Sequence, residues 1–576
     1  MRAASCWPSA AIEYAKIRNL LTAFWPGMLH RGAGGHRALS VCAWAFLILL
    51  LLPLVSLFSL WSGTDLELWR HIARNVLPYS IRDTAIVTAG VAVSVALIGT
   101  LLAALTAYCD FPGRRLLQWA AVLPLAFPTY LGAYIYVELL DASGPVQRLA
   151  REAFAADFRL PEIRSPGGAV AIFSLVLFPY VYLPARVAFA RQSANFVEVA
   201  RTLGAGRLEA FWRVNLPLAR PAIAGGIALA LMETLSDIGA AEYLGVRTLA
   251  VTIYTTWLSR GSIEVAGQLA ILLLLLVIAI LLIERGLRGR GSTVAGVRGH
   301  RQVSRIKLNP IWGAVAAGCC GLPIVLGFII PFGFLLQHSL NRALLNITSA
   351  ATSQAIFSTL ALAATAAGSV VVSAAVLALW SRQSGTGAQR LAAGVASYGY
   401  AVPSVVLALA IVFPAGALDN ALNRLIRNLF EVNPGLLLTM TGAVLVFSYW
   451  VRFQAVGFQL VDAGLKQVSS RLELASRSLG RHYYGTLKSI TVPLISPSLL
   501  AAAALVFVDV IKELPLTLLL RPIGIDTLAT NLYGHASRGA FEDGAAEAIL
   551  IAATGLVSVA IILRTAFSPA MLGQRT

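Results

Sequence analysis

The stretch EVARTLGAGRLEAFWRVNLPLARPAI, residues 198–223, decides the fold because it returns 276 positions later as LASRSLGRHYYGTLKSITVPLISPSL, residues 474–499. Both copies are polar, whereas the sequence on either side of each is strongly apolar. An arginine, a Leu-Gly pair, a Pro-Leu pair and a second proline stand in the same register in both. The repeat indicates a duplicated chain in which each half contains one copy of this polar segment.

Composition places both halves in a membrane. Of the 576 residues, 58% are hydrophobic and only 12% are charged, about half the charged share of a soluble globular protein. The formal net charge of +18 fits basic residues gathered in cytoplasmic loops, so we expect no nucleic-acid partner. The cysteines and histidines are scattered without the spacing of a disulfide framework or a metal site, so no metal ligands are assigned.

Twelve apolar segments, six in each half, are long enough to cross a hydrocarbon core about 30 Å thick. The predicted fold is all-α, a polytopic transmembrane helical bundle of two tandem six-span repeats. Because six is even, both repeats cross the membrane in the same direction, related by a pseudo-twofold axis along the membrane normal. The segments lie near 41–61, 85–108, 118–140, 168–190, 221–241, 267–283, 311–337, 355–380, 391–414, 435–453, 497–518 and 544–566.

The distribution of lysine and arginine predicts the sides of the membrane. If the amino terminus is cytoplasmic, the inside loops and tails hold 29 of the 45 basic residues and the outside loops hold 14. This bias predicts that both termini and both polar copies are cytoplasmic. The expected organisation is a basic tail (1–40), a first repeat (41–283) with its polar loop at 191–220, a Gly-rich basic linker (284–310), a second repeat (311–566) with its loop at 454–496, and a C-terminal tail (567–576).

Each polar copy has the signals of a short helical hairpin. Residues 197–203 are good helix formers, and Gly204 stands where a helix ends in a left-handed residue. Pro217 and Pro221 then stop the chain and restart it as the fifth span. Such a segment is either a rigid lever that transmits force to the spans or a pair of interfacial helices lying on lipid headgroups. The periodicity does not decide between them.

Carboxylates are repeated as well. Glu233 and Asp237 fall deep in the predicted fifth span, and Asp509 and Glu513 occupy the same places 276 residues later. Their i, i+4 spacing predicts that each pair shares one helical face. Acids at that depth rarely face lipid, so we expect a ring of carboxylates on a translocation pathway, suited to a hard cation. The alternative is structural, with Lys512 neutralising a neighbour in a helix-packing ion pair.

The polar copies resemble the EAA loop of ATP-binding-cassette importer permeases, in which E-A-A, a glycine and a final L-P stand at fixed spacing. Thirteen positions separate the glycine from the proline in both copies. The second copy departs from the pattern because Leu474 stands where the acid belongs and the acid comes one place earlier. The resemblance implies that ATPase docking involves Glu198, Ala200, Gly204 and Pro217 in the first loop, and Glu473, Ala475, Gly480 and Pro493 in the second.

In that family each loop is a coupling helix that docks on a separate ATPase, whose ATP-driven closure swings the halves from inward to outward opening. The resemblance implies tandem MetI-like repeats, a homodimeric ATPase, a periplasmic binding protein and a multi-pass location in the bacterial inner membrane. None of the five lysines follows a glycine, so the chain has no G-K-[ST] phosphate loop. We therefore expect a transport subunit that is not an enzyme and binds no cofactor, with ATP used by its partner.

The sequences ETLSDIGAAEYLG and VFVDVIKELPLTLLLRPIGIDTLA, around the repeated acids, are similar to fused iron(III) importer permeases of bacteria. That resemblance implies Fe³⁺ as cargo. Thiamine, polyamine and molybdate permeases share the loop and the topology, and aromatic residues keep thiamine open as cargo. A different class of function, an ATP-independent channel or secondary transporter, would leave the polar loops lying on the membrane. The aromatic residues in question are Tyr243, Tyr254, Trp257 and Tyr533.

Overall fold

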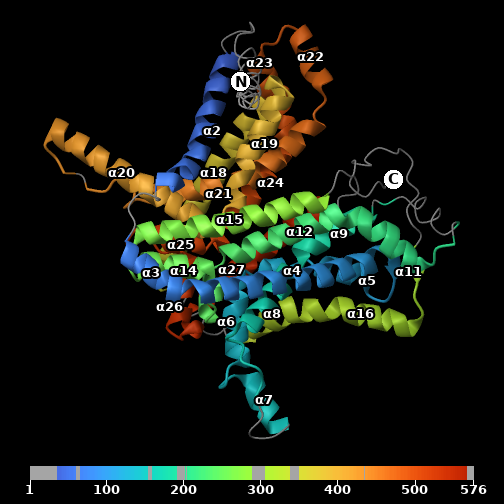
Figure 1. Cartoon of the computed structure of the whole chain (residues 1–576). Helices are drawn as coiled ribbons and strands as arrows, with labels where there is room; N and C mark the ends of the chain where they lie inside the picture. Colours follow the sequence, from blue (N-terminus) through green and yellow to red (C-terminus); the bar gives the residue numbers. More distant parts are fainter. Residues whose placement is uncertain are drawn as a thin grey trace, which may run out of the picture. The chain divides into compact units, whose positions relative to one another are not determined.

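A computed structural model describes residues 35–59, 65–153, 159–190, 192, 202, 204–288, 305–337, 349–433 and 435–566. Most of these residues are helical, as Figure 1 shows. Within the described ranges, strand pairing is limited to β1 (Cys109–Asp110) and β2 (Ile306–Lys307), which run parallel. The predicted all-α class is confirmed.

The helices of the first half alternate long spans with short connecting pieces. Their order is α2 (Gly35–Ser59), α3 (Leu66–Asn75), α4 (Leu77–Tyr108), α5 (Arg114–Ala120), η2 (Leu123–Ala126), α6 (Thr129–Leu140), α7 (Pro145–Ala153), α8 (Pro166–Leu177), α9 (Pro179–Ala190), α11 (Arg207–Ala210), η3 (Phe211–Asn215), α12 (Leu216–Ser236), α13 (Gly239–Tyr243), α14 (Leu249–Leu258) and α15 (Ile263–Arg288).

The second half follows the same plan. Its elements are α16 (Pro310–Ile324), η4 (Val325–Ile329), α18 (Ala350–Ser384), α19 (Thr386–Ala401), α20 (Ser404–Phe430), α21 (Ala443–Gln467), α22 (Ser470–Ser478), α23 (Tyr483–Thr486), η5 (Leu487–Thr491), α24 (Val492–Lys512), α25 (Pro515–Leu520), α26 (Leu528–Ser537), η6 (Phe541–Gly544) and α27 (Ala545–Ala566).

Ten helices in the described part of the chain are long and apolar enough to cross a membrane, and twelve spans result if two bent helix pairs each count as one. Every predicted segment overlaps one of these spans. The third and fourth segments are the bent pairs, with angles of 92° and 43°. The ninth and tenth differ in their bounds, because the ninth breaks before Pro403 and the tenth helix continues to Gln467.

The described residues form two compact units. One comprises the chain up to residue 52 together with 367–400 and 453–503, and the other comprises 53–366, 401–452 and 504 onward. In the second unit, α4, α8, α9, α12 and α15 pack side by side (Figure 1). Their sequences are apolar on all sides, as expected for helices that face both protein and lipid.

The first helix of each half packs against helices of the other half. In the smaller unit, the Trp44 ring of α2 meets the Trp380 ring of α18 edge-on at 5.7 Å between centroids. In the larger unit, α16 of the second half lies against α4 and α5 of the first. The chain therefore exchanges one helix between its two repeats.

Candidate translocation site and coupling loops

The fifth span of each half stops one residue before an acid. α12 ends at Ser236 and α24 ends at Lys512, so Asp237 and Glu513 lie outside the helices. The predicted fifth segment near 221–241 is therefore broken at Asp237, and its counterpart near 497–518 is broken at Glu513. In the second half Pro515 explains the break, because a proline has no N–H to bond to the carbonyl four residues earlier in a continuing helix.

These two acids start the short helices that follow. The Asp237 carboxylate accepts a hydrogen bond from the Ala240 amide at 2.7 Å, at the start of α13. The Glu513 carboxylate accepts one from the Leu516 amide at 3.0 Å, at the start of α25. Side-chain oxygens commonly satisfy the free amides of a helix's first turn. Each acid thus supports a helix start inside the packed chain.

The same acids tie the break in the fifth span to a break in the third. Pro128 precedes α6 and Pro403 precedes α20, and both prolines have extended backbone dihedrals. The hydroxyl of the next residue donates to the acid: Thr129 to Asp237, and Ser404 to Glu513 at 3.2 Å. The two halves therefore contain the same joint, built from a proline break, a hydroxyl and a carboxylate.

Glu233 and Asp509, the acids one turn earlier, are more accessible. Their side chains are 26% and 31% exposed, whereas that of Glu513 is 4% exposed. Asp509 pairs with Lys512 at 3.4 Å, as the structural alternative predicted. The repeated acids thus divide into a buried pair that holds the breaks and an accessible pair that meets basic side chains.

Arg452 is the functional candidate that the sequence analysis missed. It stands at the end of the predicted segment 435–453 and counts among the basic residues of the inside loop that follows, but it lies within α21 and is 5% exposed. Its guanidinium is 3.7 Å from the Glu513 carboxylate and 3.8 Å from that of Glu233, so it links acids from both halves. The available signal was a single arginine beside the apolar run VLVFSYWV, since a charge at such a place needs a partner.

In the described residues, no three His, Cys, Asp or Glu side chains come together as a metal-binding group. The four repeated acids and two basic side chains instead form one charged cluster with more carboxylates than cations. Chemically, such a cluster can attract a cation that displaces Arg452 or Lys512, or hold an anion on those two groups.

The aromatic candidates form a second cluster beside Glu242. The Tyr533 hydroxyl donates to the Glu242 carboxylate at 2.6 Å and also contacts the Tyr254 hydroxyl. Burial raises the pKa of Glu242, and the bond from Tyr533 opposes that shift. Tyr243 instead stacks edge-on with Tyr134 at 4.6 Å. Trp257 is half-buried on α14.

Both polar loops that were predicted to dock on the ATPase turn on a left-handed glycine. Gly204 has φ = +90° and Gly480 has φ = +84°, which confirms the predicted backbone conformation. At the second glycine the Arg481 amide donates to the Ser476 carbonyl at 3.2 Å, the closing bond of a glycine-terminated helix. Glu198 and Ala200 lie outside the described residues.

After the glycine, the two loops are built alike. A short helix (α11 or α23) leads into a five-residue π-helical turn (η3 or η5), which continues directly into α12 or α24. Pro217 and Pro493 occupy the first turn of those long helices, where a proline is tolerated. Each loop is therefore joined to its charged joint by one uninterrupted helix.

The second loop is clamped by an arginine of α18. Arg382 donates to the Leu465 and Val468 carbonyls at 2.6 and 2.9 Å, and it lies 3.4 Å from the Glu473 carboxylate. Thr491 also donates to Glu473. Glu473 thus faces the chain's own helices, while the neighbouring Ala475 lies on α22, the helix that Gly480 terminates.

The first loop is tied in a different way. The Tyr108 hydroxyl donates to the Gln192 side chain at 2.7 Å, and Gln192 donates to the Asn215 carbonyl at 2.8 Å. Phe211 packs against the rings of Tyr108 and Phe189. Aromatic packing and neutral hydrogen bonds therefore hold this loop where an arginine holds the other.

Comparison with known proteins is consistent with this geometry. The family model described as "Binding-protein-dependent transport system inner membrane component" matches residues 96–287. The Fe(3+)-transport system permease protein FbpB 2 of Haemophilus influenzae is 24% identical over 548 residues, covering 91% of this chain and 98% of that protein. A probable ABC transporter permease protein, y4fN of Sinorhizobium fredii, is 23% identical and covers 91% of this chain and 95% of its own.

A shorter relative aligns more closely with part of the chain. The molybdenum transport system permease protein ModB of Escherichia coli K12 is 30% identical over 195 residues. The alignment covers 33% of this chain and 83% of that protein. The relatives thus include both full-length and single-repeat permeases.

Proposed function

This chain belongs to the family of inner membrane components of binding-protein-dependent transport systems, and from that premise we propose that it is the permease through which ferric iron enters the cytoplasm. Members of this family work with an ATPase and a periplasmic binding protein, so the chain is a multi-pass, integral inner-membrane subunit of an ABC importer. The proposal adds three points: the cargo is ferric iron, both loops contact the ATPase, and both termini are cytoplasmic.

The observation that best supports ferric iron as cargo is the length of one sequence alignment. A relative named for Fe(3+) transport aligns with both halves of the chain and with 98% of its own length. Single-repeat relatives align with one third of the chain. The relative named for Fe(3+) transport therefore has the same two-half arrangement as this chain, which supports a shared cargo.

The charged cluster gives this cargo a physical basis. Three carboxylates pair with Arg452 and Lys512, and Asp237 stands near Glu233 as a fourth, so carboxylates outnumber cations in the cluster. Glu233 and Asp509 are the accessible pair, and carboxylate oxygens are ligands that hard cations prefer. We propose that a passing Fe³⁺ competes with the two basic side chains for these oxygens, while Asp237 and Glu513 keep the span breaks in place.

An oxyanion is the second candidate cargo, because Arg452 and Lys512 reach the same cluster. Buried guanidinium and ammonium groups are donors that an oxyanion can share. The relative that is 30% identical is named for molybdenum transport. In this alternative the accessible acids neutralise the two cations until the anion arrives.

Uptake in cells separates the two cargoes. A bacterial strain lacking this chain would be given the wild-type chain with its ATPase and binding protein, and accumulation of ⁵⁵Fe³⁺ and of ⁹⁹Mo-molybdate would be measured. Ferric uptake that is lost in the double variant Glu233→Gln with Asp509→Asn supports the proposal. Molybdate uptake without ferric uptake would replace it with the oxyanion function, and uptake that persists after ATP depletion would place the chain among channels or secondary transporters.

We further propose that both loops dock on the ATPase, the second through apolar contacts. Glu473 is engaged by Arg382, whereas Leu474 is 63% exposed and Leu479 is 85% exposed on the same loop. Exposed leucines beside a turn suit an apolar groove on a partner. Two equivalent loops suit two copies of one ATPase subunit.

The docking proposal is tested by co-purification. Leu479→Asp is expected to lose most of the bound ATPase, while Leu66→Asp, which also replaces an exposed leucine but lies on α3 outside the spans, keeps it. ATPase recovery with Leu479→Asp at the wild-type level would refute docking through this surface.

A further inference from the structure

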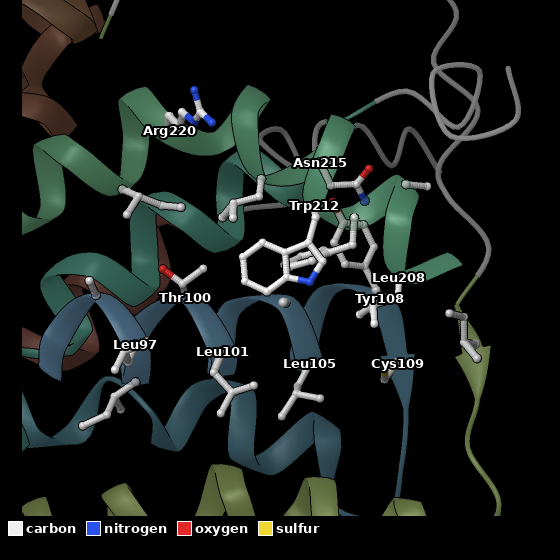
Figure 2. Close-up of a pocket in the computed structure, with 18 of the residues that line it drawn as sticks. Leu97, Thr100, Leu101, Leu105, Tyr108, Cys109, Leu208, Trp212, Asn215 and Arg220 are labelled. Carbon is white, nitrogen blue, oxygen red and sulfur yellow. The ribbon is translucent and has the colours of Figure 1, made fainter. Parts of the chain in front are cut away.

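A groove of about 1230 Å³ lies beside the first coupling loop. One wall is the last part of α4, with Leu97, Leu101 and Leu105 along it, and the other is the start of α12 with the loop that precedes it. Figure 2 shows Trp212 between these two walls. The lining is mostly apolar.

Basic residues stand at the rim of this groove. Arg305 and Lys307 line it from the segment that pairs with Cys109 and Asp110 at the end of α4, and Arg220 lies on α12. No acidic residue lines the groove in the described part of the chain. Burial and the nearby Arg114 guanidinium lower the pKa of Arg305, which indicates that positive charge is crowded here.

The depth of the groove fits the border of a bilayer. α4 has 32 residues and is therefore about 48 Å long, more than a hydrocarbon core of about 30 Å requires. Its last turns, which line the groove, reach headgroup level when the helix spans the membrane. Tyr108 and Trp212 also line it, and such aromatic side chains gather at membrane interfaces.

We propose that this groove binds one anionic phospholipid, with its phosphate at Arg305 and Lys307 and its acyl chains along the leucines of α4. Apolar walls with a basic rim match an acidic amphiphile in both charge and shape, and basic pockets between spans are known to take acidic headgroups. Placing the groove in the cytoplasmic leaflet rests on the proposed function, because that function sets the side on which the coupling loops lie.

Lipid binding can be measured without ATPase, ATP or cargo. The full chain would be delipidated in detergent, supplied with dioleoyl phosphatidylglycerol or dioleoyl phosphatidylcholine, and examined by native mass spectrometry. We expect phosphatidylglycerol to bind at least about tenfold more tightly than phosphatidylcholine. The double variant Arg305→Gln with Lys307→Gln should lose this preference, since each basic side chain near a membrane surface contributes to the attraction.

The matched control is Arg70→Gln with Arg74→Gln, two exposed arginines beyond the opposite end of α4, which should keep the preference. A second measurement places the acyl chains: phosphatidylglycerol brominated in its acyl chains should quench fluorescence that is present in the wild type and missing in Trp212→Phe. Equal affinity for the two lipids, equal loss of preference in both double variants, or no quenching assigned to Trp212 would each overturn the proposal. Failure of ferric uptake with lipid preference intact would count against the proposed cargo alone.

Discussion

The two halves of this chain share one mechanical plan but hold it together differently. In both, a left-handed glycine, a π-helical turn and a 21-residue helix lead from a polar loop to a carboxylate that joins two broken spans. The second half adds three cations at this plan's joints, namely Arg382, Arg452 and Lys512. At the matching places the first half has Ala107, the apolar helix α8 and Ser236.

This difference separates the features that each half requires from those that the whole chain requires only once. The glycine turn and the carboxylate joint occur in both copies, so each half needs its own means of carrying force from loop to span. The described helix from Leu208 to Ser236 has 29 residues, about 43 Å at 1.5 Å per residue, so a push at the loop reaches the joint without a flexible link. The three cations occur in the second half only. Because Arg452 contacts acids of both halves, we infer that these cations hold the two halves together.

Replacing either loop glycine by proline should have the largest effect on transport, and the effect should be equal in the two halves. Proline requires φ near −65°, which neither Gly204 at +90° nor Gly480 at +84° can adopt without losing the turn. We expect Gly204→Pro and Gly480→Pro each to abolish transport and ATPase co-purification while membrane insertion continues. Asparagine tolerates the left-handed region, so Gly204→Asn and Gly480→Asn serve as controls that retain both activities. Normal ATPase binding in both proline variants would refute the hypothesis that the loops are levers moved by the ATPase.

Removing Arg452 should destabilise the fold strongly and has no parallel in the first half. Arg452→Met leaves Glu233 and the buried Glu513 without their shared cation, and breaking such a pair from one side costs about 3–5 kcal/mol. The thermal unfolding midpoint in detergent should fall well below that of Val176→Met, a buried substitution on α8. Adding Glu513→Gln to Arg452→Met should restore part of the loss. Equal midpoints for Arg452→Met and Val176→Met would show that the ion pairs carry no stability.

Substituting Arg382 should affect only the second loop. Arg382→Gln loses charge-assisted hydrogen bonds to two carbonyls and the contact with Glu473, each of which contributes about 1–3 kcal/mol when the group is buried and less at its 19% exposure. We expect transport to fall several-fold, with cysteine cross-linking to the ATPase reduced at the second loop and unchanged at the first. Ala107→Gln, at the matching place on α4, should leave both cross-links intact. Loss of both cross-links with Arg382→Gln would mean that the loops do not act separately.

The sequence was informative where a pattern is local or repeated. Apolar length and the 276-residue repeat predicted the helical class and the number of segments, and Gly204 was placed in a left-handed turn because only such a residue ends a helix that way without strain. The acids were found for the same reason. What these residues do was harder to predict, because it depends on contacts between distant segments.

Arg452 and Asp237 show why local sequence patterns cannot predict contacts between distant segments. A single arginine at the end of an apolar run is counted as a loop residue until the helix is seen to continue past it to Gln467. Asp237 was assigned to a helical face because i, i+4 spacing assumes an unbroken helix. The hydroxyl of Thr129, 108 residues away, stabilises the break instead, and no local signal contains that partner.

The smallest expected effect tests whether the joints of the two halves are equally strong. Thr129→Val removes the hydroxyl that donates to Asp237, which in the described part of the chain meets no basic side chain. Ser404→Ala removes the equivalent donor to Glu513, which still has Arg452 at 3.7 Å. Leaving a buried carboxylate short of a donor costs about 1–3 kcal/mol, so Thr129→Val should lower the unfolding midpoint more than Ser404→Ala does.

A double-mutant cycle sharpens this last comparison. If Arg452 compensates for the missing hydroxyl, Ser404→Ala should become as costly as Thr129→Val once Arg452→Met is also present, a coupling of at least about 0.5 kcal/mol. Thr129→Val combined with Arg452→Met should show additive losses, because in the described residues Arg452 forms its ion pairs with Glu233 and Glu513 and not with Asp237. Additive losses in both combinations would mean that the arginine and the hydroxyl support Glu513 independently.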